Sequence, residues 1–272
     1  MIHGGNMIKI ALLSATLFSA FSLPFIGQSA QAQEIGVDPG ARNQTVTDGK
    51  PEERSNYHPL VIEAGLNYYQ FDYAEDVTPP FKSTEKGLTP GLHAAGIFQP
   101  MEAYPWHVTA IIDLATNRTD YDGSTQSGKP VLSKTSNMFF NVEFNTSYEL
   151  VQFTPTSKIE GYIGLGYHFW RRGLGASDSA PNMADYTEDY SWSYVPVGVR
   201  LLNQLNDTLQ LGIDFSVRPM FGGRIGIHLS DLNSKLQDVD ADLGSQVGFR
   251  AEVPLLAALT PGFAVLFKPS YQ

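Results

Sequence analysis

The chain has 272 residues, a formal net charge of −10 and no cysteine. The lack of cysteine excludes disulfides, a thiol nucleophile and cysteine-ligated metals, and the acidic balance opposes binding to the phosphates of nucleic acid. Charged residues make up only 17% and aromatic residues 12%. This balance is typical of membrane β-barrels, in which aromatic rings gather at the membrane interfaces.

The N-terminus has the features of an export signal. Lys9 precedes an apolar stretch over residues 10–26, and Ala30, Gln31 and Ala32 form a small-x-small cleavage pattern. The pattern predicts a signal peptide over residues 1–32, cleaved before Gln33. The alternative is an uncleaved membrane anchor, but the apolar stretch is shorter than the roughly 20 residues that a spanning helix needs.

Residues 33–56 are polar, contain proline and glycine, and show no periodicity. They predict a flexible periplasmic lead-in. The remainder, residues 57–272, predicts an outer-membrane β-barrel domain.

Apolar and polar residues alternate in segments of about ten along this domain. The clearest segment is 209–218, where every second residue from Leu209 to Val217 is apolar. A strand with one apolar and one polar face suits a wall between lipid and a polar lumen. Nine such segments lie near residues 60–73, 88–99, 106–118, 137–151, 158–172, 190–202, 209–218, 245–255 and 262–271.

Three irregularities interrupt the pattern. The apolar phase slips at Tyr68 and Tyr69, which predicts a bulge. Pro196 forfeits a ladder hydrogen bond and predicts a second bulge. Gly222 and Gly223 predict a bend in a strand that continues towards Leu229.

The connections alternate between short turns, near 100–105, 151–157, 204–207 and 257–261, and long polar loops, near 74–87, 119–135, 173–189 and 230–244. Short periplasmic turns and long extracellular loops are typical of barrels inserted from the periplasm. The sequence therefore predicts an all-β fold, an antiparallel up-and-down transmembrane β-barrel of eight to ten strands. Nine strands leave the chain on the wrong side, so we expect the protein to continue past Gln272 with a returning strand; the alternative is eight strands.

The chain resembles the small outer-membrane β-barrel proteins of Gram-negative bacteria, which include the OmpA and OmpX transmembrane domains and the opacity-type proteins. The resemblance covers residues 60–272 and lies in the architecture and in glycine-rich runs at 161–167 and 194–199. It implies a location in the bacterial outer membrane. The implied partners are outer-membrane lipid, lipopolysaccharide and an extracellular ligand or host surface at the loops.

Acidic and basic residues on the inward faces nearly balance. In a narrow lumen they should form ion pairs, because an unpaired buried charge is costly. The pattern predicts a charge-plugged interior and a structural or surface-interaction role, with a small-solute pore as the alternative. We expect Arg218 to pair with Asp214 and Glu143. The predicted interior network comprises Glu63, Asp113, Glu143, Arg200, Asp214, Arg218, Arg250 and Glu252.

No spacing favours catalysis or a cofactor. Asp113, Asp214, His168 and His228 lack the Asp-x-His arrangement of the omptin-type proteases, so we expect no enzyme activity. Asp238, Asp240 and Asp242 have a calcium-like spacing but lack the glycine and the distal glutamate of a calcium loop. We therefore expect no metal and no cofactor.

Aromatic residues at strand ends predict interfacial girdles. We expect Trp170, Tyr190 and Trp192 near the outer interface and Trp106 near the periplasmic one.

Overall fold

The computed structural model describes residues 60–75, 81–101, 104–124, 128–175, 185–260 and 263–272, and the backbone alone of residues 9–20. The predicted lead-in over residues 33–56 lies outside the described residues. Among the described residues, no helix is long and apolar enough to cross a membrane.

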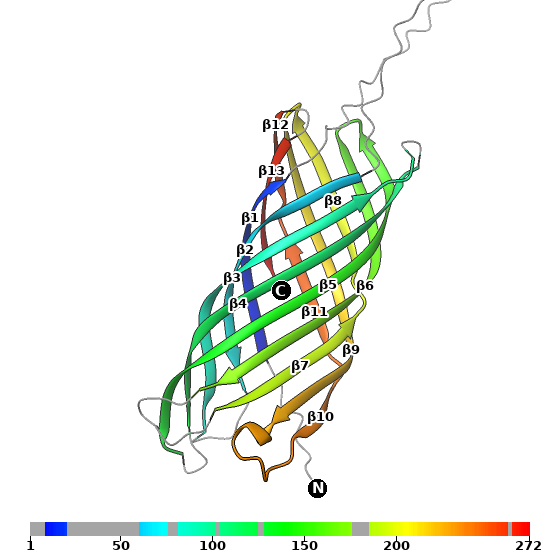
Figure 1. Ribbon diagram of the computed structural model, residues 1–272. Helices are drawn as coiled ribbons and strands as arrows, with labels where there is room; N and C mark the ends of the chain where they lie inside the picture. The colour runs from blue at the N-terminus through cyan, green and yellow to red at the C-terminus, as the bar shows by residue number, and fades with distance from the viewer. Residues whose placement is uncertain are drawn as a thin grey trace, which may run out of the picture.

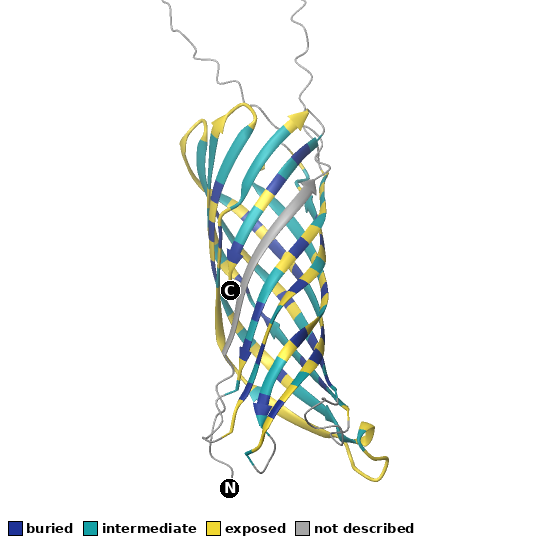
Figure 2. Ribbon diagram, turned by 90° about the vertical axis from the view of Figure 1, so that its left-hand side faces the viewer, coloured by how far each residue is buried: buried dark blue, intermediate teal, exposed yellow. Residues whose placement is uncertain are grey.

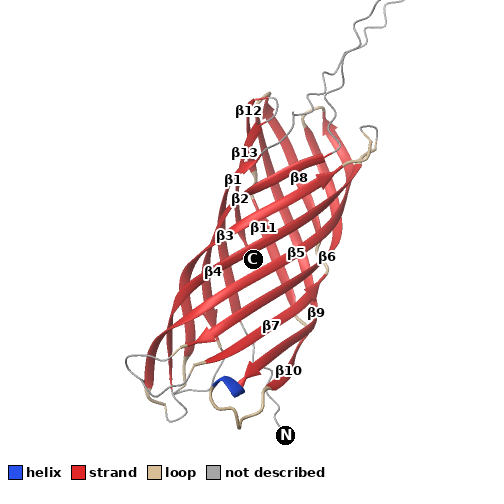
Figure 3. Ribbon diagram, viewed as in Figure 1, coloured by secondary structure: helices blue, strands red, loops and turns tan. Residues whose placement is uncertain are grey.

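The described chain is almost entirely antiparallel β-sheet, wound into one tall barrel (Figure 1). The one helical element is a single 3-10 turn, Leu229–Asp231, at the lower end of the barrel (Figure 3). The strands are β1 Lys9–Ala20, β2 Leu60–Ala74, β3 Ser83–Phe98, β4 Trp106–Ser124, β5 Pro130–Thr154, β6 Ser157–Leu174, β7 Tyr186–Tyr194, β8 Val197–Asn206, β9 Leu209–His228, β10 Val239–Gly244, β11 Val247–Glu252, β12 Leu255–Thr260 and β13 Phe263–Tyr271.

Several of these strands are pieces of one crossing of the wall. β7 and β8 both lie between β6 and β9, and β10, β11 and β12 pair in succession along β9. From β2 to β13 the chain therefore crosses the wall nine times, in the nine segments that the alternation predicts. The predicted antiparallel, up-and-down, all-β fold is confirmed.

β1 makes the tenth crossing and closes the ring of pairings. It pairs with β2 on one side, as Leu17 with Leu66, and with β13 on the other, as Leu17 with Phe267. The position beside β2 that we expected a returning strand beyond Gln272 to fill is thus held by residues 9–20. These residues lie within the predicted signal peptide, which stays a prediction.

The ends of β2, β4, β6 and β9 meet at one end of the barrel, which we call the loop end, and the ends of β3, β5, β8 and β12 meet at the other, which we call the turn end (Figure 1). Between the two ends, exposed and buried residues alternate along the strands (Figure 2). The exposed residues form a band of large apolar side chains around the turn-end part of the wall, which we call the apolar belt. It includes Ile62, Leu66, Leu92, Phe98, Ile112, Leu114, Phe144, Tyr148, Ile163, Leu165, Val199, Ile213, Phe215, Phe249 and Phe267.

Beyond the apolar belt, the same strands continue towards the loop end but their outward residues become polar. Oppositely charged side chains face each other across neighbouring strands there, an arrangement that stabilises a sheet surface in water. We call these six residues the polar collar: Lys86 with Asp72 at 3.6 Å, Lys134 with Asp120 at 2.8 Å, and Arg171 with Asp189 at 2.7 Å. The strands are longer than the roughly 9–11 residues needed to cross a bilayer, so the polar collar lies beyond the lipid.

The predicted bulge at Tyr68 and Tyr69 is wrong. β2 pairs with β3 in one unbroken register, and Phe71 and Tyr73 are buried inside the barrel. The apolar phase changes because outward residues beyond Tyr68 leave the lipid, while inward aromatic residues fill the lumen.

The aromatic girdle predicted at the outer interface is wrong for the same reason. Trp170 is 1% and Tyr190 4% exposed, both inside the barrel, and Trp192 lines an interior cavity. Trp106 begins β4 at the turn end, as predicted.

Proline and glycine interrupt the wall in different ways. The ladder breaks at Val195 and Pro196, but Tyr194 and Val197 keep the same register with β9, so no bulge forms there. At Gly222, with φ +61°, the register of β9 does shift, as predicted. The shift turns Ile225 inward onto buried aromatic rings and leaves Arg224 exposed.

The two faces of the wall can be separated by labelling. Single cysteines at Phe144 and Phe215, which are 55% and 46% exposed, should react with lipid-phase probes. Cysteines at their chain neighbours Glu143 and Asp214, each 2% exposed, should not. Equal labelling of both pairs in reconstituted protein would overturn the inside-out assignment.

Candidate functional site

The interior near the loop end holds one buried arginine that contacts three glutamates, which together we call the Arg172 cluster. Arg172 is 2% exposed. Its guanidinium contacts Glu85, lies 2.8 Å from Glu188 and 3.4 Å from Glu75, and sits 5.0 Å above the ring of Tyr73. Surrounding one cation with carboxylates and a ring face offsets the cost of burying it.

Glu85 is completely buried and has further donors. Thr119 and Thr135 donate to its second oxygen at 3.0 and 2.6 Å. Asn137 donates to Thr119 at 2.8 Å and accepts a hydrogen bond from the Trp170 indole at 2.7 Å. Hydrogen bonds that satisfy both the charge and its partners make such a network rigid.

Aromatic rings lie next to the Arg172 cluster, on the side towards the turn end. Trp170 stacks on Tyr190 at 4.5 Å and on Phe139 at 5.8 Å, and meets Phe71 and Tyr73 edge-on. We call these five residues the aromatic stack. They come from β2, β5, β6 and β7, so the rings extend across the lumen from opposite walls.

A second layer of charge lies nearer the middle of the barrel, and we call it the middle layer. Arg218 contacts Glu143 and lies 4.7 Å above the ring of Tyr194, while Arg250 contacts Glu252. His93 Nδ1 lies 2.6 Å from Asp113, and its Nε2 lies 3.9 Å from Glu63. The middle layer comprises Glu63, His93, Asp113, Glu143, Arg218, Arg250 and Glu252.

A third group lies towards the turn end. Arg200 pairs with Asp214 at 2.8 Å and lies 3.8 Å from Glu160, which also meets Lys158 at 2.8 Å. Tyr162 donates to Asp214 at 2.7 Å.

The eight predicted interior residues thus lie in two of these groups. Arg200 and Asp214 form one group, and the other six belong to the middle layer. The expected contact of Arg218 with Asp214 is wrong, because Arg200 directly opposes Asp214 across β8 and β9 and engages it instead. The expected pairing of Arg218 with Glu143 is present.

Sequence reasoning missed the Arg172 cluster. Glu85 and Glu188 fall in segments predicted as loops, because outward residues there are polar and the alternation disappears. His93 was missed because 88–99 is the least distinct segment. The sequence did offer one sign of the cluster. Arg172 lies two positions after the inward Trp170, so strand alternation places its charge inside the barrel.

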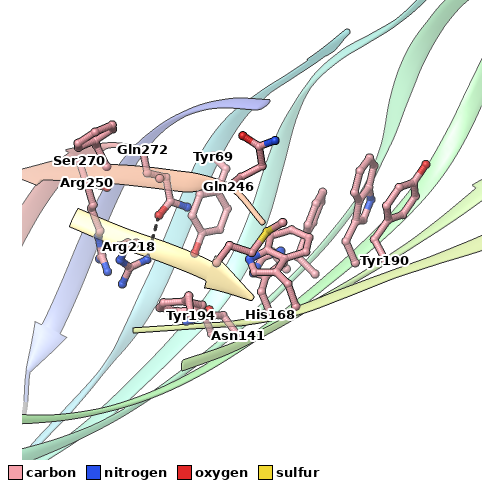
Figure 4. A pocket seen from close by; sticks show the side chains of 18 of the residues that line it. Tyr69, Asn141, His168, Tyr190, Tyr194, Arg218, Gln246, Arg250, Ser270 and Gln272 are labelled. Atoms are coloured by element: carbon pink, nitrogen blue, oxygen red, sulfur yellow. Dashed lines mark hydrogen bonds between the residues drawn. The ribbon is translucent and has the colours of Figure 1, made fainter. Parts of the chain in front are cut away.

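A cavity of about 370 Å³ lies between the aromatic stack and the middle layer. Aromatic and charged side chains meet around it, and Arg218 donates to Gln272 at 3.5 Å across one side (Figure 4). Its size is within the range of small-molecule sites in proteins.

The residues weighed for catalysis do not all meet at one place: His168 and Asp113 line the cavity, but Asp214 and His228 do not. His168 lines the cavity and stacks on Trp192 at 4.4 Å. Asp113 is held by His93, Asp214 by Arg200, and His228 lies at the outer surface beside the polar collar. The described residues include no group of three or more His, Asp or Glu side chains placed to hold a metal ion.

No family model matches the sequence, and no curated protein matches it. Three solved structures with similar folds have low sequence identity. The translocator domain of autotransporter NalP from Neisseria meningitidis is 7% identical, over 99% of this chain and 88% of that one, with a TM-score of 0.46. The outer membrane protein OprG from Pseudomonas aeruginosa is 12% identical, over 98% and 96%, with a TM-score of 0.36. The outer membrane protease OmpT from Escherichia coli is 6% identical, over 97% and 95%, with a TM-score of 0.35.

Outside the lumen, His228 joins the loop after β9 to the polar collar. Its Nε2 lies 3.2 Å from Asp189 and its Nδ1 3.3 Å from Asp238, which accepts the Ser230 amide at 2.9 Å. The hydrogen bond to Asp189, and then that to Asp238, raise the pKa of His228. Arg171 lowers the pKa of Asp189, and the Ser230 amide lowers that of Asp238.

Two adjacent arginines test the value of burial. Replacing Arg172 by Met leaves three glutamates without their cation and should reduce the free energy of unfolding by about 3 kcal/mol or more. Replacing its neighbour Arg171, whose side chain is 51% exposed, removes a surface pair and should cost at most about 1 kcal/mol. Urea unfolding in lipid vesicles measures both. Equal losses would show that the buried cluster adds nothing beyond a surface ion pair.

The raised pKa of His228 sets a direction for pH dependence. The stabilisation that protonated His228 gives to the loop after β9 is fully present below the unfolded pKa of 6.5. It is lost as pH rises through the higher folded pKa, while Asp189 and Asp238 stay ionised. Amides in 229–238 should exchange faster with solvent, after correction for intrinsic rates, as pH rises from about 6 to about 8. The substitution His228→Gln should abolish this trend and Arg224→Gln should preserve it. A trend that persists in His228→Gln would rule out His228 as its cause.

Proposed function

We propose that the chain is a non-enzymatic β-barrel of the bacterial outer membrane, with a closed interior and a structural or surface-interaction role. The observation that carries this proposal is the Arg172 cluster above the aromatic stack. Two successive layers fill the lumen, and each is fixed by contacts from several strands.

The apolar belt supports the location. Large aliphatic and aromatic side chains exposed all round a closed sheet need an apolar solvent, and a barrel that leaves no unpaired edge is the form of β-sheet that spans a bilayer. In bacteria such barrels belong to the outer membrane.

The polar collar supports the proposed partners. Its basic members Lys86, Lys134 and Arg171 lie just beyond the apolar belt, where the phosphate groups of lipopolysaccharide would be, and each is balanced by an aspartate. The loops above it would meet an extracellular ligand or a host surface.

A small-solute pore is the second candidate, and it is favoured by the cavity of about 370 Å³ below the aromatic stack. The buried contacts of the aromatic stack and of the Arg172 cluster, which extend into the lumen, argue against it.

Planar-bilayer conductance separates the two. The wild-type protein should show no steady current. The double substitution Trp170→Ala with Arg172→Ala removes the centres of both closing layers and should produce discrete current steps. The matched control is Phe169→Ala with Arg171→Ala, the outward neighbours on the same strand, and it should stay silent. Folding of each variant is checked by its heat-modifiable mobility in gels. Steady current through the wild type would establish the pore instead.

A further inference from the structure

The cavity below the aromatic stack has one aromatic wall. Trp192 stacks on His168 at 4.4 Å with an interplanar angle of 27°, and His168 lies 6.4 Å from Phe139. Phe139 stacks in turn on Trp170 at 5.8 Å. These rings belong to β5, β6 and β7 and form an aromatic wall, which a planar apolar group can meet on a free ring face or edge-on.

The adjoining part of the wall, on β9 beside β7 and on β11 beyond it, carries two guanidinium groups. Arg218 lies on β9 and Arg250 on β11, in neighbouring positions of the paired strands: Arg218 faces Gly248, and Arg250 faces Ser216. Both side chains point into the same part of the cavity, away from His168 and Tyr190 (Figure 4). Gly248 and Ser216, the partners of the two arginines across this pair of strands, are small, and the ring of Tyr194 packs against Arg218 at 4.7 Å.

These two arginines have donors to spare. A guanidinium offers five N–H groups. With the described residues, Arg218 donates to Glu143 and to Gln272, and Arg250 donates to Glu252. The bond to Gln272 is 3.5 Å long, at the limit for a hydrogen bond, so a stronger acceptor would replace it.

We propose that this cavity binds a small aromatic carboxylate. Its ring stacks on the wall formed by Phe139, His168 and Trp192, and its carboxylate accepts hydrogen bonds from Arg218 and Arg250. A carboxylate is the acceptor that matches a guanidinium pair, because charge-assisted bonds to it are the strong ones.

Other classes of ligand fit less well. A cation would meet both guanidiniums, and Asp113, the acidic side chain of the lining, is already held by His93 at 2.6 Å. An aliphatic acid would leave the aromatic wall without a stacking partner, and a neutral ring would leave the guanidinium donors without an acceptor. The inference goes beyond the proposed function, since a closed barrel and a conducting one could both hold such a ligand.

Tryptophan fluorescence reports on this site directly. The chain has three tryptophans, and two of them, Trp170 and Trp192, line the cavity. Trp106→Phe removes the third, which lies outside the cavity, and supplies the background for all measurements in lipid nanodiscs. The probe is 4-nitrobenzoate, whose nitro group quenches indole emission. The neutral 4-nitrobenzamide has nearly the same shape, and cyclohexanecarboxylate serves as a non-aromatic competitor.

We expect saturable quenching by 4-nitrobenzoate, with the amide binding about tenfold more weakly or worse because it lacks the charge. Cyclohexanecarboxylate should compete poorly. Arg218→Gln and Arg250→Gln should each weaken binding by about tenfold or more. Arg224→Gln, an exposed arginine outside the lumen, should leave the affinity unchanged. If a glutamine variant fails to fold, Arg218→Lys and Arg250→Lys replace it, since they keep the charge that Glu143 and Glu252 need but lose the planar donor pair.

Three results would overturn the proposal. The first is an absence of saturation up to about 10 mM probe, and the second is equal binding of the acid and the amide, which indicates simple partition into an apolar space. The third is unchanged affinity in both arginine variants. These outcomes are independent of conductance, so failure here leaves the proposed function standing.

Discussion

Inside a bilayer no water can hydrogen-bond a free backbone group, so every strand of this wall must be paired on both sides. The remaining features of the molecule depend on that constraint. Pro196 and Pro254 remove amide donors, yet the register stays intact and their carbonyls still accept bonds, from Gly164 at 2.9 Å and from Gly212 at 2.7 Å. The register shift at Gly222 occurs where the outward face is already polar. Irregular backbone is thus tolerated where neighbouring strands or water satisfy it.

The fold could be predicted from sequence because lipid imposes a clear alternation of residues. The nine segments with that alternation fall on strands, and in the clearest of them Ile213 and Phe215 are exposed as expected. Strand ends at the loop end could not be predicted. There β5 begins at Pro130 and β7 at Tyr186, several residues before the alternation starts, because both faces are polar or the inward face is aromatic. The alternation therefore identifies only the part of each strand that faces lipid, and the strands extend beyond that part.

The interior was only partly predictable. Parity along a strand identifies inward charges, and Glu143 with Arg218 follows from it. Which inward charges pair with each other cannot be read from the sequence, because it depends on the stagger between strands. Arg200 pairs with Asp214, and His93 with Asp113. The Arg172 cluster draws glutamates from three strands or their ends, separated by up to 97 residues of sequence from their arginine. Only the closed wall brings them together.

The polar collar also sets the height of the loops. Along β9, His228 lies seven positions after Phe221, which is at the edge of the apolar belt. At about 3.3 Å per residue with the usual tilt, this places the strand end about 15 Å beyond the belt. The segment 229–238 is therefore presented well above the lipid headgroups on a rigid stem. A peptide tag inserted in this segment would lie clear of the part of the wall that lipid holds in place.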